Sequence, residues 1–346
     1  MNRPVMLSFV NDYCECAHEN ILRRIAEENY QKKPGYGTDE ICKSAAERIR
    51  REASCPGAEI FFLAGGTQTN QVVIDTMLAS YEGVLACGTG HVNVHEAGAI
   101  EFSGHKVLTL PEHNGKIDAA EAEEYVSAFY GDANHEHMVF PGMIYISHPT
   151  EYGTLYSKAE LTALRNVCDR HGMKLYLDGA RLAYALACPE NDLTLADIAA
   201  LTDVFYIGGT KCGALFGEAV VFTKGNKPAH FVARVKQHGA LIAKGWLLGI
   251  QFDELFKDGL YLKNGKNAID RASEIKKVLV AKGYRFLKES PTNQLIIVLD
   301  DERKEELAKS VKLDFWEKVD ETHTAMRICT SWATTREDTD ALIRLL

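Results

Sequence analysis

Two short apolar runs, each ending in polar residues beside glycine, most strongly limit what this chain can fold into. Residues 174–177 are rich in β-forming side chains and are followed directly by Asp178. Residues 204–207 have the same character and are followed by a glycine-flanked turn that contains Lys211. Such runs are typical of buried parallel strands, which present their functional residues at their carboxyl ends. The pattern predicts an α/β fold with a mostly parallel sheet and with Asp178 and Lys211 at the ends of neighbouring strands.

An acid and a lysine in these positions suit one particular cofactor. An aspartate can keep a pyridinium nitrogen protonated, and a lysine can form a Schiff base with an aldehyde. The pair Asp178 and Lys211 therefore predicts that the chain binds pyridoxal 5'-phosphate.

A glycine pair follows the apolar run at residues 59–63 and opens a helical stretch, in the sequence AGGTQTN. Free N–H groups and the dipole at a helix N-terminus attract an anion, and threonine hydroxyls add donors. The motif therefore predicts an anion site at this turn, with the hydroxyls of Thr67 and Thr69 as donors, and a phosphate group is the expected anion. The alternative is a capped turn that needs Gly65 and Gly66 only for its backbone angles.

The next strand, residues 84–88, leads into GTGHVNVHEAGA. Gly88 and Gly90 match the first two glycines of the dinucleotide fingerprint G-x-G-x-x-G, but Asn93 stands in place of the third. The signal for a dinucleotide-binding fold is therefore weak. A nucleotide-binding protein that uses the Gly65–Gly66 loop is the alternative without pyridoxal phosphate. His91 and His95 are four residues apart, but no HExxH motif accompanies them, and we predict no metal site. His91 is the better candidate for a ring stacked on the cofactor.

The composition excludes several classes of function. The 346 residues carry a formal net charge of −9, which argues against nucleic acid or an anionic membrane as the main partner. No run of about eighteen apolar residues occurs, so no transmembrane helix is expected, and the first residues lack the long apolar region of a signal peptide. Nine cysteines are scattered apart from Cys14-x-Cys16, which favours a reducing cytoplasm.

The order of elements predicts three parts: an N-terminal arm (1–20), a large cofactor-binding domain (21–250) and a small C-terminal α+β domain (251–346). Residues 213–224, GALFGEAVVFTK, have the pattern of a strand pair or hairpin. Near the end of the chain, alternation points the side chain of Arg327 away from those of its apolar neighbours.

Taken together, the segments LAGGTQTN, GTGHVNVHEAGA, YLDGARLAYA, YIGGTKCGALFGE and MRICTSWATTREDTD resemble the threonine aldolase family of fold-type I pyridoxal-phosphate enzymes, in the β-eliminating lyase superfamily. The resemblance covers nearly the whole chain. It implies the aspartate-aminotransferase-like fold and retro-aldol cleavage of an L-β-hydroxy-α-amino acid (L-threonine, L-allo-threonine or a phenylserine-like compound) to glycine and an aldehyde. The alternative is β-elimination, as in tryptophanase, tyrosine phenol-lyase or cysteine lyases, which releases pyruvate and ammonia.

The resemblance also implies roles for the residues around the cofactor. Lys211 would carry pyridoxal phosphate as a Schiff base, and Asp178 would pair with the pyridine nitrogen. Gly66 and Thr67 would hold the phosphate, and His91 would stack on the ring.

On the substrate side, the resemblance places Arg181 between cofactor and substrate and Arg327 on the substrate carboxylate. Asn11 stands where the family commonly has serine, and it would add a donor to that carboxylate. Many members carry a histidine in an E-N-T-H turn near the substrate hydroxyl, whereas this chain has ISHPTEYGT, with Glu151 at about that place and His148 earlier. The base for the hydroxyl proton is therefore open between Glu151, His91 and a bound water.

The family places its active site between subunits. A homo-oligomer, either a dimer or a homotetramer, is thus implied, with the loop around Tyr36 as a candidate contribution from the partner chain.

Overall fold

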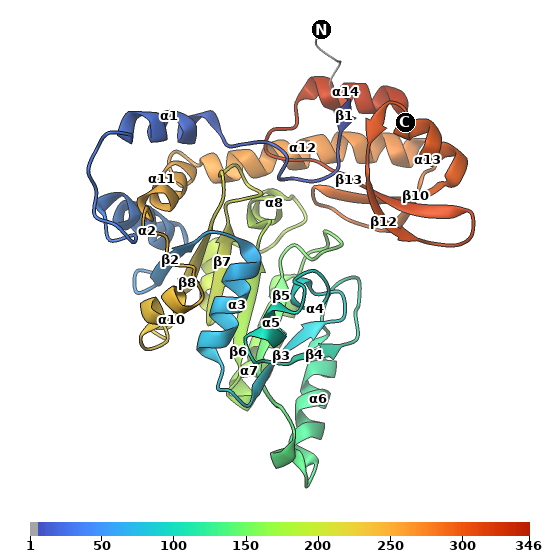
Figure 1. Ribbon diagram of the computed structural model, residues 1–346. Coiled ribbons are helices and arrows are strands. Elements are labelled where there is room, and N and C mark those ends of the chain that lie inside the picture. The colour runs from blue at the N-terminus through green and yellow to red at the C-terminus, as the bar shows by residue number, and fades with distance from the viewer. Residues whose placement is uncertain (1–5) are drawn as a thin grey trace.

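The computed structural model describes residues 6–346, so the first five residues of the predicted arm lie outside the described part of the chain. At its centre is a seven-stranded sheet (Figure 1). In spatial order its strands are β2 (Glu59–Leu63), β8 (Glu218–Phe222), β7 (Val204–Gly208), β6 (Lys174–Gly179), β5 (Phe140–Ser147), β3 (Glu82–Cys87) and β4 (Val107–Leu110).

Only β8 runs against the other strands of this sheet. The strands from β7 through β6, β5 and β3 to β4 pair in parallel, and β8 is antiparallel to both β7 and β2. The carboxyl ends of β2, β3, β5, β6 and β7 therefore all open at one edge of the sheet. This confirms the predicted mostly parallel sheet, and residues 174–177 and 204–207 lie in neighbouring strands.

The predicted hairpin at residues 213–224 is wrong, because this segment supplies one strand only. The backbone before β8 folds back on the turn after β7, where the N–H groups of Gly209 and Thr210 both donate to the oxygen of Gly217. The strand itself finds its two partners, β2 and β7, elsewhere in the chain.

Helices cover both faces of the sheet, which explains why its strands are apolar throughout. One face packs against α3 (Gly66–Met77), α5 (Ala99–Phe102) and α10 (Phe231–Gln237). The other packs against α2 (Glu40–Glu52), α6 (Ala119–Gly131), α7 (Lys158–His171), α8 (Leu182–Ala187), α9 (Leu195–Leu201) and α11 (Trp246–Leu255). The other helical elements before residue 250 are α1 (Glu19–Glu28), α4 (His91–Val94) and the 3₁₀ turn His135–His137.

A second, antiparallel sheet lies at the upper right of Figure 1. Its strands, in order, are β12 (Asp314–Lys318), β13 (His323–Cys329), β10 (Gln294–Asp300) and β9 (Arg285–Lys288). It is accompanied by α12 (Leu260–Ala281), α13 (Asp301–Ala308) and α14 (Arg336–Leu345). The domain boundary near residue 250 stays a prediction.

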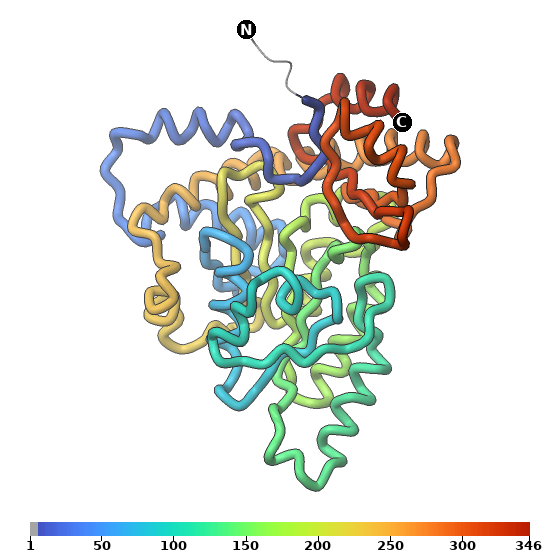
Figure 2. The backbone as a smooth tube through the Cα atoms, turned by 45° about the vertical axis from the view of Figure 1, so that its right-hand side comes forward, coloured from blue at the N-terminus to red at the C-terminus, as the bar shows by residue number. Residues whose placement is uncertain are grey.

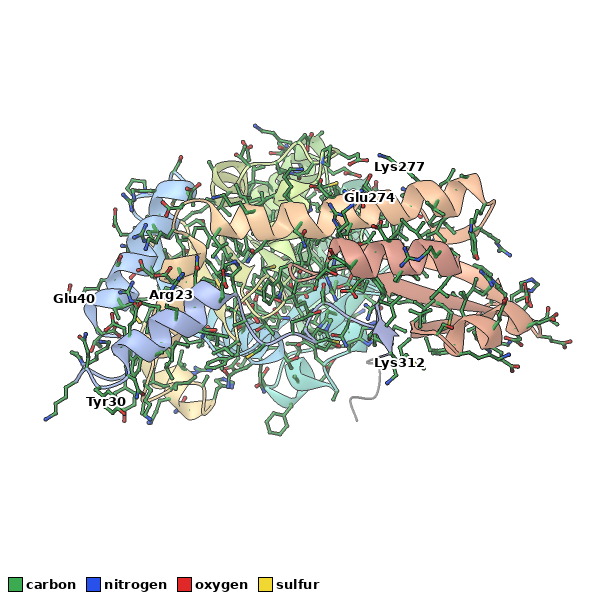
Figure 3. All side chains as sticks on the ribbon, turned by 90° about the horizontal axis from the view of Figure 1, so that it is seen from above. Arg23, Tyr30, Glu40, Glu274, Lys277 and Lys312 are labelled. Carbon is green, nitrogen blue, oxygen red and sulfur yellow. The ribbon has the colours of Figure 1, made fainter. Side chains whose placement is uncertain are left out.

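The N-terminal arm crosses from α1 to this second sheet, as the tube in Figure 2 shows. Its first strand, β1 (Leu7–Ser8), pairs in parallel with β11 (Val311–Lys312), and Figure 3 shows Lys312 beside it. At the other end of the molecule, Tyr30 projects from the segment after α1. Within residues 6–346, no helix is both long and apolar enough to span a membrane.

A close crossing of α8 and α12 joins the second part of the chain to the edge of the large sheet where the strands end. The hydroxyl of Tyr261 on α12 donates to the oxygen of Gly208, at the end of β7, and accepts the N–H of Ala183 on α8. One turn on, Gly265 lies against the same backbone, and a Cβ there would overlap the carbonyl group of Ala183. The crossing thus requires glycine at this position.

We predict that Gly265→Ala lowers the free energy of unfolding by about 1–3 kcal/mol, because the added methyl group has no space and must push the two helices apart. Gly131→Ala is the control, since a Cβ at that helical glycine meets no atom within 4 Å. Urea denaturation followed by circular dichroism measures both. Equal stability of the two variants would contradict the proposed tight crossing.

Candidate active site

A pocket of about 400 Å³ opens at the edge where the parallel strands end. A second pocket, of about 540 Å³, adjoins it and extends to the antiparallel sheet. Both pockets are lined by Tyr13, His91, His95, Glu151, Arg181 and Lys211. The first pocket also contains Gly66, Thr67 and Asp178, and the second contains Arg327. The structure therefore brings together every predicted site residue except Asn11.

The turn after β2 forms an open anion cradle in the first pocket. Gly65 precedes α3 in an extended conformation, and no side chain caps this helix. The N–H groups of the first turn, at Gly66 and Thr67, therefore face the pocket with the positive end of the helix dipole. A Cβ at Gly66 would come 3.3 Å from the hydroxyl of Tyr206, which is a tight contact. Glycine therefore leaves space between the helix N-terminus and Tyr206. The donor set suits a phosphate group.

Asp178 ends β6 as a buried carboxylate held by three donors. Its Oδ1 accepts the N–H of Ala180 at 2.9 Å, and its Oδ2 accepts the hydroxyl of Tyr145 at 2.6 Å and the amide of Asn70 at 3.1 Å. Asn70 is in turn oriented by the hydroxyl of Tyr176, at 2.7 Å. These hydrogen bonds fix the direction of the carboxylate. Asp178 can therefore serve as a fixed anion facing the pocket.

His91 begins α4, after β3, and two carboxylates position it. Its Nδ1 lies 2.7 Å from Oε1 of Glu96, and its backbone N–H donates to Oε1 of Glu151 at 2.9 Å. The same Glu151 oxygen accepts the hydroxyl of Ser147 at 2.7 Å. Burial raises the pKa of Glu96 and that of Glu151. The ring of His91 is thus fixed at the pocket wall, with its Nε2 free of any partner in the described chain.

Lys211 follows β7, and its ammonium group has no hydrogen bond or ion pair among residues 6–346. Its Nζ lies 5.8 Å from the ring centroid of Tyr13, which comes from the arm. Burial lowers the pKa of Lys211, and the charge of Arg181 lowers it further, against the opposing carboxylates of the pocket. A lysine of this kind is a nucleophile ready for a carbonyl group.

Arg181 is paired with Asp12 of the arm, deep in the structure. Its Nε lies 2.6 Å from Oδ2 of Asp12 and its second nitrogen 3.1 Å from Oδ1, and Asn293 donates to the same carboxylate at 2.9 Å. Burial alone would raise the pKa of Asp12, but the charges of Arg181 and Lys211 outweigh burial and lower it. Asp12 thereby fixes Arg181 at the wall shared by the two pockets.

Arg327 reaches the second pocket from β13. Its guanidinium group donates to Asp314 at 2.6 Å and to Gln294 at 2.8 Å, and it lies 5.6 Å from the ring of Trp316. The carboxylate of Asp314 is one-third exposed, so this partner can exchange for another carboxylate. The planar fork of Arg327 suits a bidentate contact with a small acid.

The candidate Asn11 does not face this space, and neither does His148 in the turn after β5. Asn11 lines neither pocket, and its Oδ1 accepts the N–H of Tyr13 at 3.0 Å and the thiol of Cys14 at 3.2 Å. His148 is fully buried, bonded to Asn191 and to the N–H of Tyr156, and burial lowers its pKa to about 4. The described residues contain no group of three or more potential metal ligands.

Several polar residues of the site were missed by sequence reasoning: Asp12, Asn70, Glu96, Tyr145 and Glu218. Their common feature is burial among hydrogen-bond partners that are distant in sequence. Only Asp12 carried a signal, as part of a polar pair interrupting an apolar arm. Such a pair needs buried partners.

Comparisons with known proteins agree with this geometry. The family model described as beta-eliminating lyase matches residues 20–314. A low specificity L-threonine aldolase from Pseudomonas sp. (strain NCIMB 10558) is 34% identical over 247 residues, which cover 69% of this chain and 68% of that protein. A solved structure of Leishmania major threonine aldolase has a TM-score of 0.94 and 43% identity, and the match covers 98% of both chains.

A more distant structure, aspartate aminotransferase from Thermus thermophilus, has a TM-score of 0.70 at 15% identity and covers 99% of this chain and 92% of its own. At that identity the likeness concerns the fold alone. It confirms the predicted aspartate-aminotransferase-like fold.

Glu218 generates a prediction about pH. Its carboxyl group, at the start of β8, accepts the hydroxyl of Thr210 at 2.8 Å and the N–H of Gly209 at 3.1 Å, and burial raises its pKa from 4.5 to about 8. Between these values the folded protein binds a proton that the unfolded chain releases. The stability contributed by Glu218 therefore falls as the pH rises from 4.5 to about 8, and it is level above that.

We predict that Glu218→Gln makes the decline in stability between about pH 5 and pH 8 shallower, by up to about 1.4 kcal/mol per pH unit. Urea denaturation of the cofactor-free protein at several pH values measures the slope. Glu305→Gln, at an exposed position of α13, is the control and should leave the slope unchanged. Identical slopes in all three proteins would show that Glu218 does not hold this proton.

Proposed function

The chain belongs to the beta-eliminating lyase family and, within it, to the threonine aldolases. From this membership we propose that it cleaves an L-β-hydroxy-α-amino acid, such as L-threonine, into glycine and an aldehyde. The proposed cofactor is pyridoxal 5'-phosphate. The observation that carries the proposal is the meeting, in one pocket, of a lysine without a partner in residues 6–346, a buried carboxylate and an uncapped helix N-terminus. The preferred side chain of the substrate is left open between threonine, allo-threonine and aromatic compounds.

The residues of the first pocket fit pyridoxal phosphate group by group. The open N–H groups at Gly66 and Thr67 would hold the phosphate, and Lys211 would hold the aldehyde carbon. Asp178, fixed by its three donors, would face the pyridine nitrogen, and the ring of His91 would cover one face of the cofactor. When bound there, the cofactor supplies an acceptor for the electron pair released when the Cα–Cβ bond of the substrate breaks.

The second pocket supplies the substrate contacts. We propose that Arg327 binds the α-carboxylate, in place of Asp314, and that Arg181 adds a second positive charge at the shared wall. Holding the carboxylate sets which bond at Cα stands in the orientation for cleavage. Asn11 could add a donor only if its local turn with Tyr13 and Cys14 rearranged.

The elimination reaction is not favoured, although the family model carries that name. The named relatives are threonine aldolases, at identities well above the range in which only the fold is shared. A substrate panel separates the reactions, because an aldolase releases glycine and an aldehyde, whereas an eliminating lyase releases pyruvate and ammonia.

We also propose a homo-oligomer, a dimer or a homotetramer, with the active site at the subunit interface, and a cytoplasmic location. Support for the first comes from Tyr36, whose large aromatic side chain is half exposed on its loop and so is open to contact with a second subunit. Support for the second is the scattered, unpaired set of cysteines.

We predict that Lys211→Ala nearly abolishes L-threonine cleavage, because no other lysine lines the two pockets. The purified protein should absorb in the near-visible range after soaking with pyridoxal phosphate, and the variant should lose this band. Lys282→Ala, at an exposed position directly after α12 that lines neither pocket, is the control. Absence of the band in the unaltered protein would refute the cofactor, whereas a band without aldehyde release would refute the reaction.

Arg327 and Asp314 should have opposite effects on substrate binding. We predict that Arg327→Ala raises KM for L-threonine about 10–100-fold, the cost of losing a charged hydrogen bond. Asp314→Asn should lower KM, because the competing carboxylate is removed. Steady-state kinetics measures both, with the exposed Arg285 of the same sheet as the control in Arg285→Ala. A raised KM in Asp314→Asn would show instead that Asp314 is needed to orient Arg327.

A further inference from the structure

The residue that follows α4, His95, borders both pockets. It lines the cofactor pocket together with Lys211 and the substrate pocket together with Arg327. Its ring centroid lies 5.6 Å from that of His91. Neither imidazole nitrogen of His95 has a hydrogen-bond or ion-pair partner in residues 6–346, and the side chain is open to the pocket. A free imidazole at the junction of two pockets is available to a bound ligand.

The other candidate groups of this region are already engaged. One oxygen of Glu151 accepts both the N–H of His91 and the hydroxyl of Ser147, so this carboxylate is tied to the wall. His91 itself is held by Glu96 through Nδ1 and belongs to the cofactor face. His148 is buried and bonded away from the pocket. His95 is the remaining imidazole of the two pockets that no protein contact holds.

We propose that His95 is the base that removes the proton from the β-hydroxyl group of the substrate. This inference rests on the proposed aldol cleavage and assigns within it the step that the sequence left open. It follows from the position of His95, which faces the space between the lysine at the reacting carbon and the arginine at the carboxylate.

The step balances as follows. A ring nitrogen of His95 accepts the hydroxyl proton, and the electron pair of that O–H bond becomes the second bond of the aldehyde carbonyl. The Cα–Cβ bond breaks, and its electron pair stays with the glycine fragment, where one proton from the pocket or solvent completes glycine. His95 then returns its proton to solvent, so no oxidant or further reactant is needed.

The surrounding charges keep His95 ready to accept a proton. Burial lowers its pKa, and the neighbouring His91, Arg327 and Lys211 lower it further. Arg327 on β13 and Lys211 after β7 bring positive charge to the substrate pocket, and Glu151, Asp314 and Glu317 are the carboxylates that line it together with His95. These effects favour the neutral ring, which is the form that a general base requires.

The first test compares two reactions in the holoenzyme. His95→Asn should lower kcat for L-threonine cleavage roughly 10²–10³-fold, within the usual range for general-base catalysis. Exchange of the glycine α-proton with solvent should remain, because that reaction uses the same cofactor and carboxylate contacts but no β-hydroxyl. Glu151→Gln is the competitor variant, and His113→Asn, at an exposed histidine outside the pockets, is the matched control.

Each outcome has one meaning. If cleavage and exchange fall together in His95→Asn, the residue has a structural role, and if neither falls, it is not the base; both results overturn the proposal. A selective loss in Glu151→Gln, with His95→Asn unaffected, would assign the step to Glu151. An unaltered protein that binds the cofactor yet cleaves no β-hydroxy amino acid would overturn the proposed function itself.

A second readout needs no cofactor. Proton NMR of the cofactor-free protein should show one imidazole, identified by its loss in His95→Asn, with a midpoint below about 6.5. Arg327→Ala should raise that midpoint, because a positive neighbour is removed. A midpoint that Arg327→Ala does not move would show that His95 does not face the carboxylate site, and would overturn the assignment.

Discussion

One buried ion pair, between Asp12 and Arg181, holds together the parts from which the site is built. Arg181 follows β6 of the large sheet, Asp12 belongs to the N-terminal arm, and Asn293, next to β10 of the second sheet, donates to the same carboxylate. Removing one partner of a buried pair leaves an uncompensated charge, at a cost of about 3–5 kcal/mol. The arm and the second sheet are therefore coupled to the edge where Lys211 lies, and the substrate pocket with Arg327 exists only because they meet there.

Burial sets the charge balance of this enclosed space. It raises the pKa of Glu96, Glu151 and Glu218 and lowers that of Lys211. In each of these groups burial acts against the charged form, and the shift for Glu218 is large enough to bring its pKa to about 8. Asp178 is held in place by three hydrogen-bond donors. The pocket thus combines one carboxylate of fixed direction with several groups whose pKa values are displaced by burial.

The sequence predicted those parts of the site that strand geometry alone determines. Asp178 and Lys211 end apolar runs, and parallel neighbours must bring such ends to one edge. Asp12 and Arg181, by contrast, are 169 positions apart, and no local pattern links them. The same limit explains the hairpin error, since an apolar strand such as β8 has one pattern whether its partner is adjacent or distant. Membership of a family supplied the reaction, which periodicity could not.

The assignment of His95 follows from geometry and not from sequence position. The turn after β5 has no free imidazole for the substrate, because His148 is used to bond Asn191 and Tyr156, and Thr150 is buried against Thr154. The loop after β3 ends at the same edge of the sheet, so a side chain from it can enter the same space. Proton transfer requires a neutral imidazole within reach of the hydroxyl, from whichever loop supplies it. His95, in the loop after β3, can thus supply the imidazole that the turn after β5 does not provide.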